Sequence, residues 1–210
     1  NVDLIGTGLA TEADTNSTIV DCSGVTGVGI SITWDGVGLA GHRLEGFWLK
    51  AGDGTTASSV TAGIQIGVYC SYWYLEHIRV TGCTDGVMGG AGVQTGLYVA
   101  SDRIDYGINY DGVPNGIVGP WRQSGNFSGT LLSCHFKNND VGIVLGTSTQ
   151  NTMLIRTATT SNYSWGIHLA GCENITTVSC QFEKNGKKND STSGSVLLQS
   201  VTGFSMLGCY

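Results

Sequence analysis

The sequence has few charged residues, few prolines and no long apolar run. Of its 210 residues only 12% are charged and only two are proline, whereas 33 are glycine. Long solvated helices need many charged side chains, and disordered chains are commonly rich in charge or proline, so the composition argues against both. The many Gly, Ser, Thr and Asn residues instead favour short strands joined by tight turns.

Positive charge is scarce as well. The net charge of −6 and the isoelectric point near 5.0 argue against a partner of duplex nucleic acid, because such proteins need a basic face to displace counterions. No stretch reaches the roughly 20 apolar residues of a membrane-spanning helix. The glycine-rich segments lack a phosphate-binding motif. We therefore expect no nucleic acid, no membrane and no cofactor as partners.

The seven cysteines form no C-x-x-C pair and none of the short spacings of a zinc site. We therefore expect no metal site and look for the role of the cysteines in the repeats of the sequence.

A four-residue phrase of glycine, a branched apolar residue, any residue and an apolar residue recurs at 29–32, 63–66, 96–99, 142–145 and 166–169, with a degenerate copy at 195–198. The second half of the chain repeats every 23 residues. The positions in this register are Leu132, Ile155 and Val178; Cys134, Thr157 and Cys180; Phe136, Thr159 and Phe182; and Asn139, Asn162 and Asn185. Asn151 and Asn174 share the interval.

A period of 23 with alternating polarity predicts a parallel β-helix, because helical solenoids need about 33 residues or more per repeat. In such a coil each turn contributes about three short strands, and equivalent residues stack about 4.8 Å apart. Alternation predicts that Leu132, Cys134 and Phe136 face inward and that Ser133 and His135 face outward. The cysteines at 134 and 180, and Cys209 at an interval of 29, are then small apolar core residues.

Two further expectations follow from the repeat. The asparagine ladder fits a bend that needs a left-handed residue, and stacked amides can also bond along the axis. The first half is looser, so we expect insertions at 51–62, 82–93 and 111–123. The outward positions of the phrase predict one line along the solenoid, formed by Ser31, Gln65, Tyr98, Val144, His168 and Leu197.

The opening strand Val2-Asp3-Leu4-Ile5-Gly6-Thr7-Gly8, followed by Thr18-Ile19-Val20-Asp21, together with the later G-I-x-L and S-C-x-F coils, resembles the pectate-lyase-like superfamily. The resemblance is to its branch of bacteriophage tailspikes and polysaccharide depolymerases. It implies an all-β, right-handed, single-stranded parallel β-helix with coils of about 23–34 residues. Residues 1–210 would form one domain, the central part of a longer chain.

Members of that branch that cut polysaccharides use carboxylates on the outer face or between subunits. The densest acidic segment is Asp102-Arg103-Ile104-Asp105-Tyr106, which suggests a general acid and base, Asp102 and Asp105, steadied by Arg103. The alternative is a polar bend with solvated carboxylates.

A second candidate is the segment around Glu76, which resembles the segment around Glu45 at an offset of 31. The two glutamates would stack on adjacent coils, and Trp48 would lie beside Arg79. Aromatic rings beside charged groups suit sugars. The carbohydrate-binding candidates are Trp48, Trp73, Arg79, Tyr98 and Arg103. The alternative is that the aromatic residues form a subunit contact or pack a turn.

The resemblance implies a virion tail component that binds, and as a glycoside hydrolase or polysaccharide lyase cleaves, a bacterial surface polysaccharide, with three β-helices side by side as a homotrimer. Whether the chain is an enzyme stays open at this point. One alternative is a non-catalytic structural stalk or adhesin. Another is a secreted polysaccharide lyase or epimerase, which would depend on calcium.

Overall fold

The computed structural model describes residues 4–6, 18–32, 39–40, 43–51, 59–66, 70–71, 74–76, 78–83, 85–89, 94–100, 108–111, 121–123, 127–146 and 149–210. All regular structure in these ranges is β-strand, arranged in parallel sheets.

Three long parallel sheets form the walls, which we call sheets A, B and C. Sheet A contains, in order, β1 (Leu4–Ile5), β5 (Arg43–Glu45), β9 (Tyr74–Glu76), β12 (Gln94–Ala100), β15 (Phe127–Leu132), β18 (Met153–Ile155), β21 (Glu173–Val178) and β24 (Thr202–Leu207). Sheet B contains β2 (Thr18–Asp21), β6 (Phe47–Lys50), β10 (Ile78–Thr81), β13 (Ile108–Asp111), β16 (His135–Lys137), β19 (Ala158–Thr160) and β22 (Gln181–Glu183). Sheet C contains β3 (Gly27–Ile32), β7 (Val60–Ile66), β11 (Asp85–Gly89), β14 (Trp121–Gln123), β17 (Val141–Leu145), β20 (Trp165–Ala170) and β23 (Gly194–Gln199). A short pair, β4 (Leu39–Ala40) and β8 (Cys70–Ser71), forms a separate two-stranded sheet.

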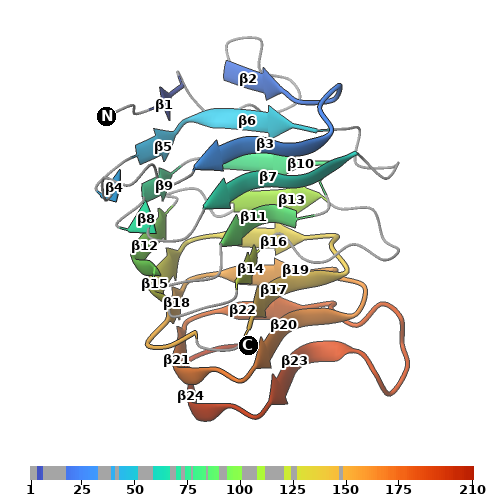
Figure 1. The fold of residues 1–210 in the computed structure, drawn as a ribbon. Coiled ribbons are helices and arrows are strands. Elements are labelled where there is room, and N and C mark those ends of the chain that lie inside the picture. The colour runs from blue at the N-terminus through green and yellow to red at the C-terminus, as the bar shows by residue number, and fades with distance from the viewer. Residues whose placement is uncertain are drawn as a thin grey trace.

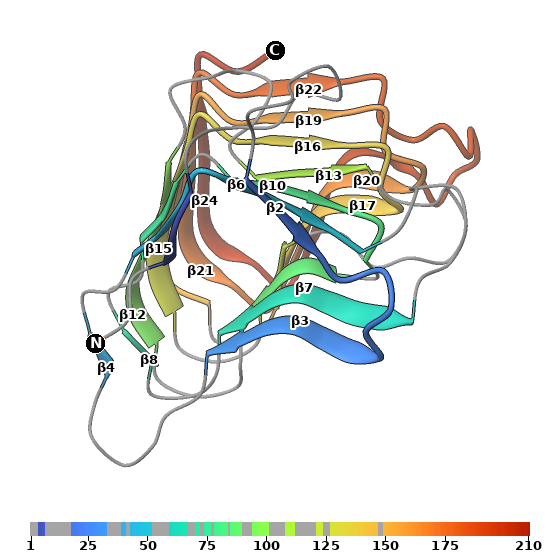
Figure 2. The same ribbon diagram turned by 90° about the horizontal axis from the view of Figure 1, so that it is seen from above.

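The chain visits sheets A, B and C in turn, so that each coil stacks on the one before it (Figure 1). Viewed from the N-terminal end, the path runs clockwise as it recedes (Figure 2). The protein is therefore a parallel β-helix, as the period predicted, and it is right-handed, as the resemblance implied.

The core is a set of inward-facing ladders. Buried residues from all three sheets form one cluster that includes Leu75, Ile78, Phe136, Ile143 and Ile167. The 23-residue register is confirmed, since Leu132, Ile155 and Val178 are paired neighbours, as are Phe136, Thr159 and Phe182.

The cysteines fill this core. Cys22, Cys83, Cys134, Cys172 and Cys180 are buried free thiols, and Cys209 packs against the same cluster. Burial raises the pKa of the Cys180 thiol to about 11. The interpretation of Cys134, Cys180 and Cys209 as small core residues is confirmed.

The prediction that Leu132 faces inward is wrong. Leu131 is buried in the core, whereas Leu132 is only half-buried on the outer face of sheet A. The next residue, Ser133, has a positive φ of 52°, and Arg156 and Ser179 repeat that conformation one and two coils later. This left-handed bend between sheets A and B resets the alternation, so that Cys134 and Phe136 do face inward.

The asparagine ladder is confirmed, although its first explanation is wrong. Nδ2 of Asn139 donates to Oδ1 of Asn162 at 3.2 Å, and Nδ2 of Asn162 donates to Oδ1 of Asn185 at 2.8 Å. The left-handed residues at this corner are the preceding ones, Asn138, Ser161 and Lys184. The structural role of Asn139, Asn162 and Asn185 is therefore the hydrogen bonding between their stacked amides. Asn151 and Asn174, in contrast, do take positive φ values of 49° and 53°.

The glycine of the recurrent phrase is explained by the close packing of neighbouring coils. A Cβ at Gly142 would lie 2.6 Å from the carbonyl oxygen of Gly166, and one at Gly166 would lie 2.6 Å from that of Ser195. Each glycine thus lies against the backbone of the next coil, where a side chain does not fit.

Two predictions for the first half are wrong. Tyr98 lies on β12 of sheet A, paired with Tyr74 and Thr130, and not on the sheet C line. That line runs through Gln65, Met88, Arg122 and Val144 to His168 and Leu197. The segment 82–93 contains β11, so it is not an insertion: a glycine phrase on sheet A was read as a copy of the phrase on sheet C.

Candidate functional site

The corner between sheets A and B brings the second pair of predicted segments together. β5 passes into β6 through Gly46, which has a φ of 69°. A Cβ on Gly6, one coil above, would overlap the Gly46 carbonyl oxygen. Because the corner is a single glycine, the last residue of β5 lies only three positions before Trp48, the second residue of β6. This last residue is Glu45.

Glu45 and Glu76 are direct neighbours in the parallel register of β5 and β9. Adjacent strands of a sheet lie about 4.8 Å apart, so the two glutamates begin from backbone positions one rung apart. Glu45 also pairs with Arg43 on its own strand, with 3.1 Å between Arg43 Nε and Glu45 Oε2. The prediction that the two glutamates stack on adjacent coils is confirmed.

Trp48 and Arg79 are neighbours in the register of β6 and β10. The centre of the Arg79 guanidinium lies 4.5 Å from the centroid of the Trp48 ring, and the Lys50 ammonium lies 5.6 Å from it. The indole Nε1 donates to Thr81 Oγ1 at 2.8 Å. This is the predicted pair, but Trp48 is only 8% and Arg79 only 7% exposed, so little of either reaches solvent.

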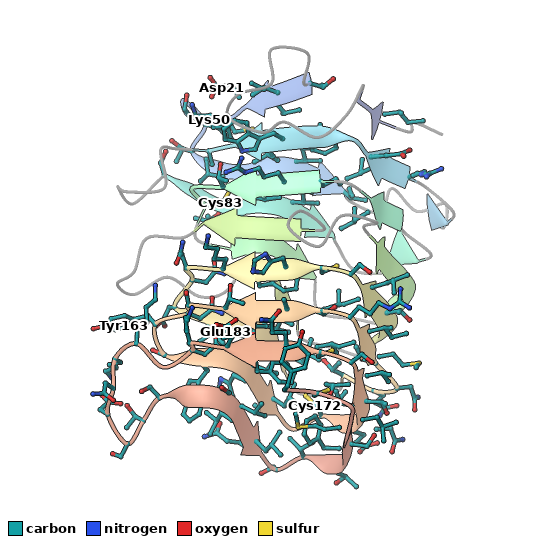
Figure 3. The ribbon with its side chains drawn as sticks, turned by 180° about the vertical axis from the view of Figure 1, so that it is seen from behind. Asp21, Lys50, Cys83, Tyr163, Cys172 and Glu183 are labelled. Atoms are coloured by element: carbon teal, nitrogen blue, oxygen red, sulfur yellow. The ribbon has the colours of Figure 1, made fainter. Side chains whose placement is uncertain are left out.

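Charged residues and threonines share one register of sheet B, which we call the charged ladder; Thr81 in it is buried, and Asp111 is placed by its backbone pairing alone. Its members, by pairing, are Asp21, Lys50, Thr81, Asp111, Lys137, Thr160 and Glu183. Figure 3 views this sheet, with Asp21 and Lys50 toward its N-terminal end and Glu183 toward the other. A bond from the backbone amide of Ser23 is the main cause that lowers the pKa of Asp21.

The remaining predicted residues are only partly visible. Asp102, Arg103, Asp105 and Trp73 lie outside the described residues. Glu76 and Tyr98 are placed by the register of their strands alone. Their proposed roles remain predictions.

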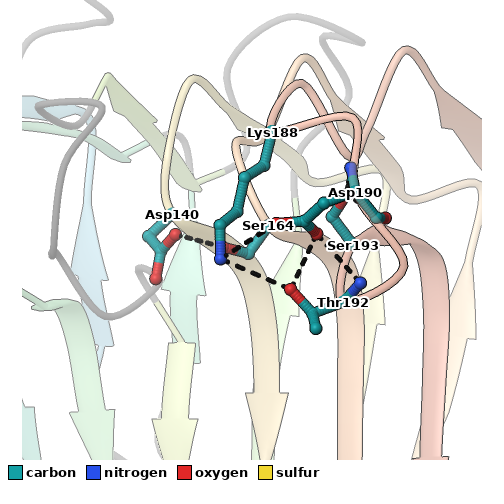
Figure 4. A network of polar contacts seen from close by, with 6 residues as sticks. All are labelled: Asp140, Ser164, Lys188, Asp190, Thr192 and Ser193. Carbon is teal, nitrogen blue, oxygen red and sulfur yellow. Dashed lines mark hydrogen bonds and ion pairs between the residues drawn. The ribbon is translucent and has the colours of Figure 1, made fainter.

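Sequence reasoning passed over the loop between β22 and β23. Asp190 Oδ1 accepts bonds from the hydroxyl and the backbone amide of Thr192, at 2.7 and 2.9 Å, and Lys188 Nζ lies 3.3 Å from Asp190 Oδ2 (Figure 4). The bonds from Thr192 are the main cause that lowers the pKa of Asp190. In the coil above, Ser164 Oγ donates to Asp140 Oδ1 at 2.6 Å. The signal in the sequence was the lysine-rich run inside an interval of 29 where earlier coils take 23.

His168 faces outward on sheet C, as predicted, with Nε2 2.9 Å from Gln199 Oε1.

Among the residues that the structure describes, no group of three or more His, Cys, Asp or Glu is arranged to hold a metal ion. Nor does the described part of the chain contain a helix long and apolar enough to cross a membrane. No protein-family model, curated protein or solved structure matches the chain.

Proposed function

We propose that this chain is part of a bacteriophage tailspike or tail fibre that binds a bacterial surface polysaccharide and cleaves it with paired carboxylates. The observation that carries the proposal is the A–B corner, where Glu45 and Glu76 share one register position beside the stacked Trp48 and Arg79. The resemblance of the opening strand and of the repeated coils to tailspike β-helices supports the setting, a virion tail outside the cell.

The chemistry follows from the spacing. A rung of about 4.8 Å between the two backbone positions is close to the carboxylate separation of retaining glycosidases, about 5–5.5 Å. One carboxyl group would protonate the glycosidic oxygen while the other attacks the anomeric carbon, and water would then release the sugar. Asp102 and Asp105 are the second candidate pair for the same task.

A homotrimer is part of the proposal. Leu132, Ile155, Val178 and Leu207 form an aliphatic register on the outer face of sheet A, in which Leu207 is 56% exposed. Met153, on the same face, is 41% exposed. An aliphatic face of this kind supports side-by-side packing of β-helices. Sedimentation equilibrium measures the mass, and a monomer at micromolar concentration would contradict this part.

The test of binding and cleavage combines a glycan array of host surface polysaccharides with a reducing-end assay. We expect the unaltered chain to bind a host glycan and release reducing ends, and Glu76→Gln to lower the release by about 100-fold or more with binding kept. Asp102→Asn and Asp105→Asn test the other pair in the same way. Gln65→Ala, on sheet C, is the matched control and should leave both readouts unchanged.

The burial of Trp48 and Arg79 favours a second candidate, a structural stalk or adhesin without catalysis. That candidate predicts no release of reducing ends from any host glycan, whichever carboxylate is changed.

A further inference from the structure

The lysines of this acidic chain gather at one corner. The chain has five lysines, and four of them, Lys137, Lys184, Lys187 and Lys188, lie where sheet B passes toward sheet C in the last coils. Lys137 ends β16, and the other three lie in the 184–193 connection between β22 and β23. A protein of net charge −6 thus concentrates its ammonium groups on one short stretch of its surface.

The 184–193 connection is held firmly against the coil above it. The backbone amides of Gly186 and Lys187 donate to the Asn162 carbonyl oxygen at 3.0 and 3.3 Å, and that of Lys188 donates to Tyr163 at 3.0 Å. Farther along, Asp190 is bonded to Thr192. The corresponding connection one coil earlier, residues 161–164, is six residues shorter. In solenoids, additional residues of this kind often form the binding face.

This anchoring directs Lys187 upward across two coils. Its Nζ donates to Asn138 Oδ1 at 3.2 Å, next to Lys137. An ammonium group has three donors, and Asn138 is a neutral partner that takes one of them. Among the described residues, neither Lys137 nor Lys187 forms an ion pair with a carboxylate, whereas Lys184 pairs with Glu183 and Lys188 with Asp190.

We propose that Lys137 and Lys187 bind the carboxylates of an acidic polysaccharide; this rests on the proposed function and names the class of glycan. Thr160 is the neighbour of Lys137 in the next coil, and its hydroxyl group bonds to His135 Nε2 at 2.7 Å. A nucleic acid is a poorer fit, because it needs an unbroken basic face.

The probes are hyaluronan, which carries a carboxylate on every second ring, neutral dextran, and oligothymidylate, each titrated against the whole chain at low and high salt. We expect hyaluronan binding that weakens with salt. Lys137→Gln and Lys187→Gln should each weaken it about two- to fivefold, as for exposed ion pairs. Arg156→Gln removes one positive charge next to β18, three strands along sheet A from Glu76 and on the other side of sheet B from the lysines, and should change nothing; thermal melting verifies that every variant is folded.

Hyaluronan binding that is absent, or equal in the lysine variants and the unaltered chain, overturns the inference. Oligothymidylate binding of equal strength and equal sensitivity also overturns it, because the corner would then be a general polyanion site. If the glycan array detects only neutral host glycans and the lysine variants bind them normally, this inference fails while the proposed function stands. If no glycan of any kind binds, both fail.

Discussion

At the scale of single residues, the solenoid depends on buried side chains that bond to neighbouring coils. Asn162 is fully buried, and its amide bridges three coils: Nδ2 donates to Asn185 Oδ1 and to the Phe136 carbonyl oxygen, while Oδ1 accepts from Asn139. Every bond of a ladder residue is shared with a neighbouring coil. Loss of one such residue therefore leaves partners unsatisfied in coils that are otherwise unchanged.

The first prediction concerns this amide. Asn162→Ala should lower the free energy of unfolding by about 3 kcal/mol, because Asn139 and the Phe136 carbonyl oxygen lose their bonds to the Asn162 side chain, and Asn185 Oδ1 keeps only the bond from the Asn162 backbone amide. Urea unfolding followed by circular dichroism measures the change. Asn189→Gly removes the same amide from an exposed position with a φ of 51°, and should cost less than about 0.5 kcal/mol. Equal effects of the two substitutions would contradict a structural role for the ladder.

The second prediction concerns the recurrent glycine. In Gly166→Ala the new Cβ would lie 2.5 Å from Thr159 Oγ1 and 2.6 Å from the Ser195 carbonyl oxygen, so two coils must separate. We expect a loss of about 3 kcal/mol, as for an overpacked core. Gly24→Ala is the control, since nothing lies within 4 Å of its added Cβ. Thermal melting compares the two variants, and equal melting temperatures would contradict a role of the recurrent glycine in coil packing.

At the scale of strands and connections, the register of the repeated positions was predicted correctly from the sequence. The orientation of side chains next to a left-handed bend was not. The 23-residue register could be derived because stacked coils place equivalent side chains in contact. Leu132 was misplaced because Ser133, in an unremarkable S-C context, adopts the left-handed conformation, and alternation cannot be extended through it. Tyr98 was misplaced because glycine followed by a branched residue occurs inside strands of more than one sheet.

The candidate site was predictable to the same extent. An offset of 31 between two similar segments was enough to pair Glu45 with Glu76 and Trp48 with Arg79. Burial of Trp48 and Arg79 was not predictable, because alternation gives only the side of the sheet on which a residue lies. The lysine corner was missed for another reason: Lys187 meets Asn138 across 49 residues, through a connection that does not repeat.

The third prediction concerns the 184–193 connection. Bonds from Thr192 lower the pKa of Asp190, so its ionised form stabilises the connection above the ordinary carboxyl pKa, and this contribution is lost as the pH falls through the lowered pKa. We expect the Thr192 amide to remain protected from exchange down to about pH 4 and to lose protection below it. Amide exchange monitored by NMR measures this. Asp190→Asn should remove the pH dependence, and a protection that persists unchanged in very acidic solution would contradict it.

At the scale of the whole molecule, the three outer faces differ in chemistry although the core is continuous. Sheet A presents aliphatic side chains in its later coils, sheet B presents the charged ladder, and sheet C presents a mixed line through Val144 and His168. Inward ladders hold the coils together whatever the outer faces carry. A β-helix can therefore assign association to one face and recognition to another without a change of core.

The fourth prediction tests whether the coil is the unit of the fold. Deletion of residues 157–179 removes 23 residues and joins Arg156 to Cys180, so that the left-handed bend is kept, Phe182 stacks on Phe136 and Asn185 on Asn139. Because each coil contacts only its neighbours, we expect a folded β-protein with a lower melting temperature. Deletion of residues 157–168 is the control: it joins Arg156 to Leu169, leaves only the last two residues of β20 at a sheet B position and should abolish folding. Circular dichroism and size-exclusion chromatography compare the two, and equal behaviour of both deletions would show that register does not define the fold.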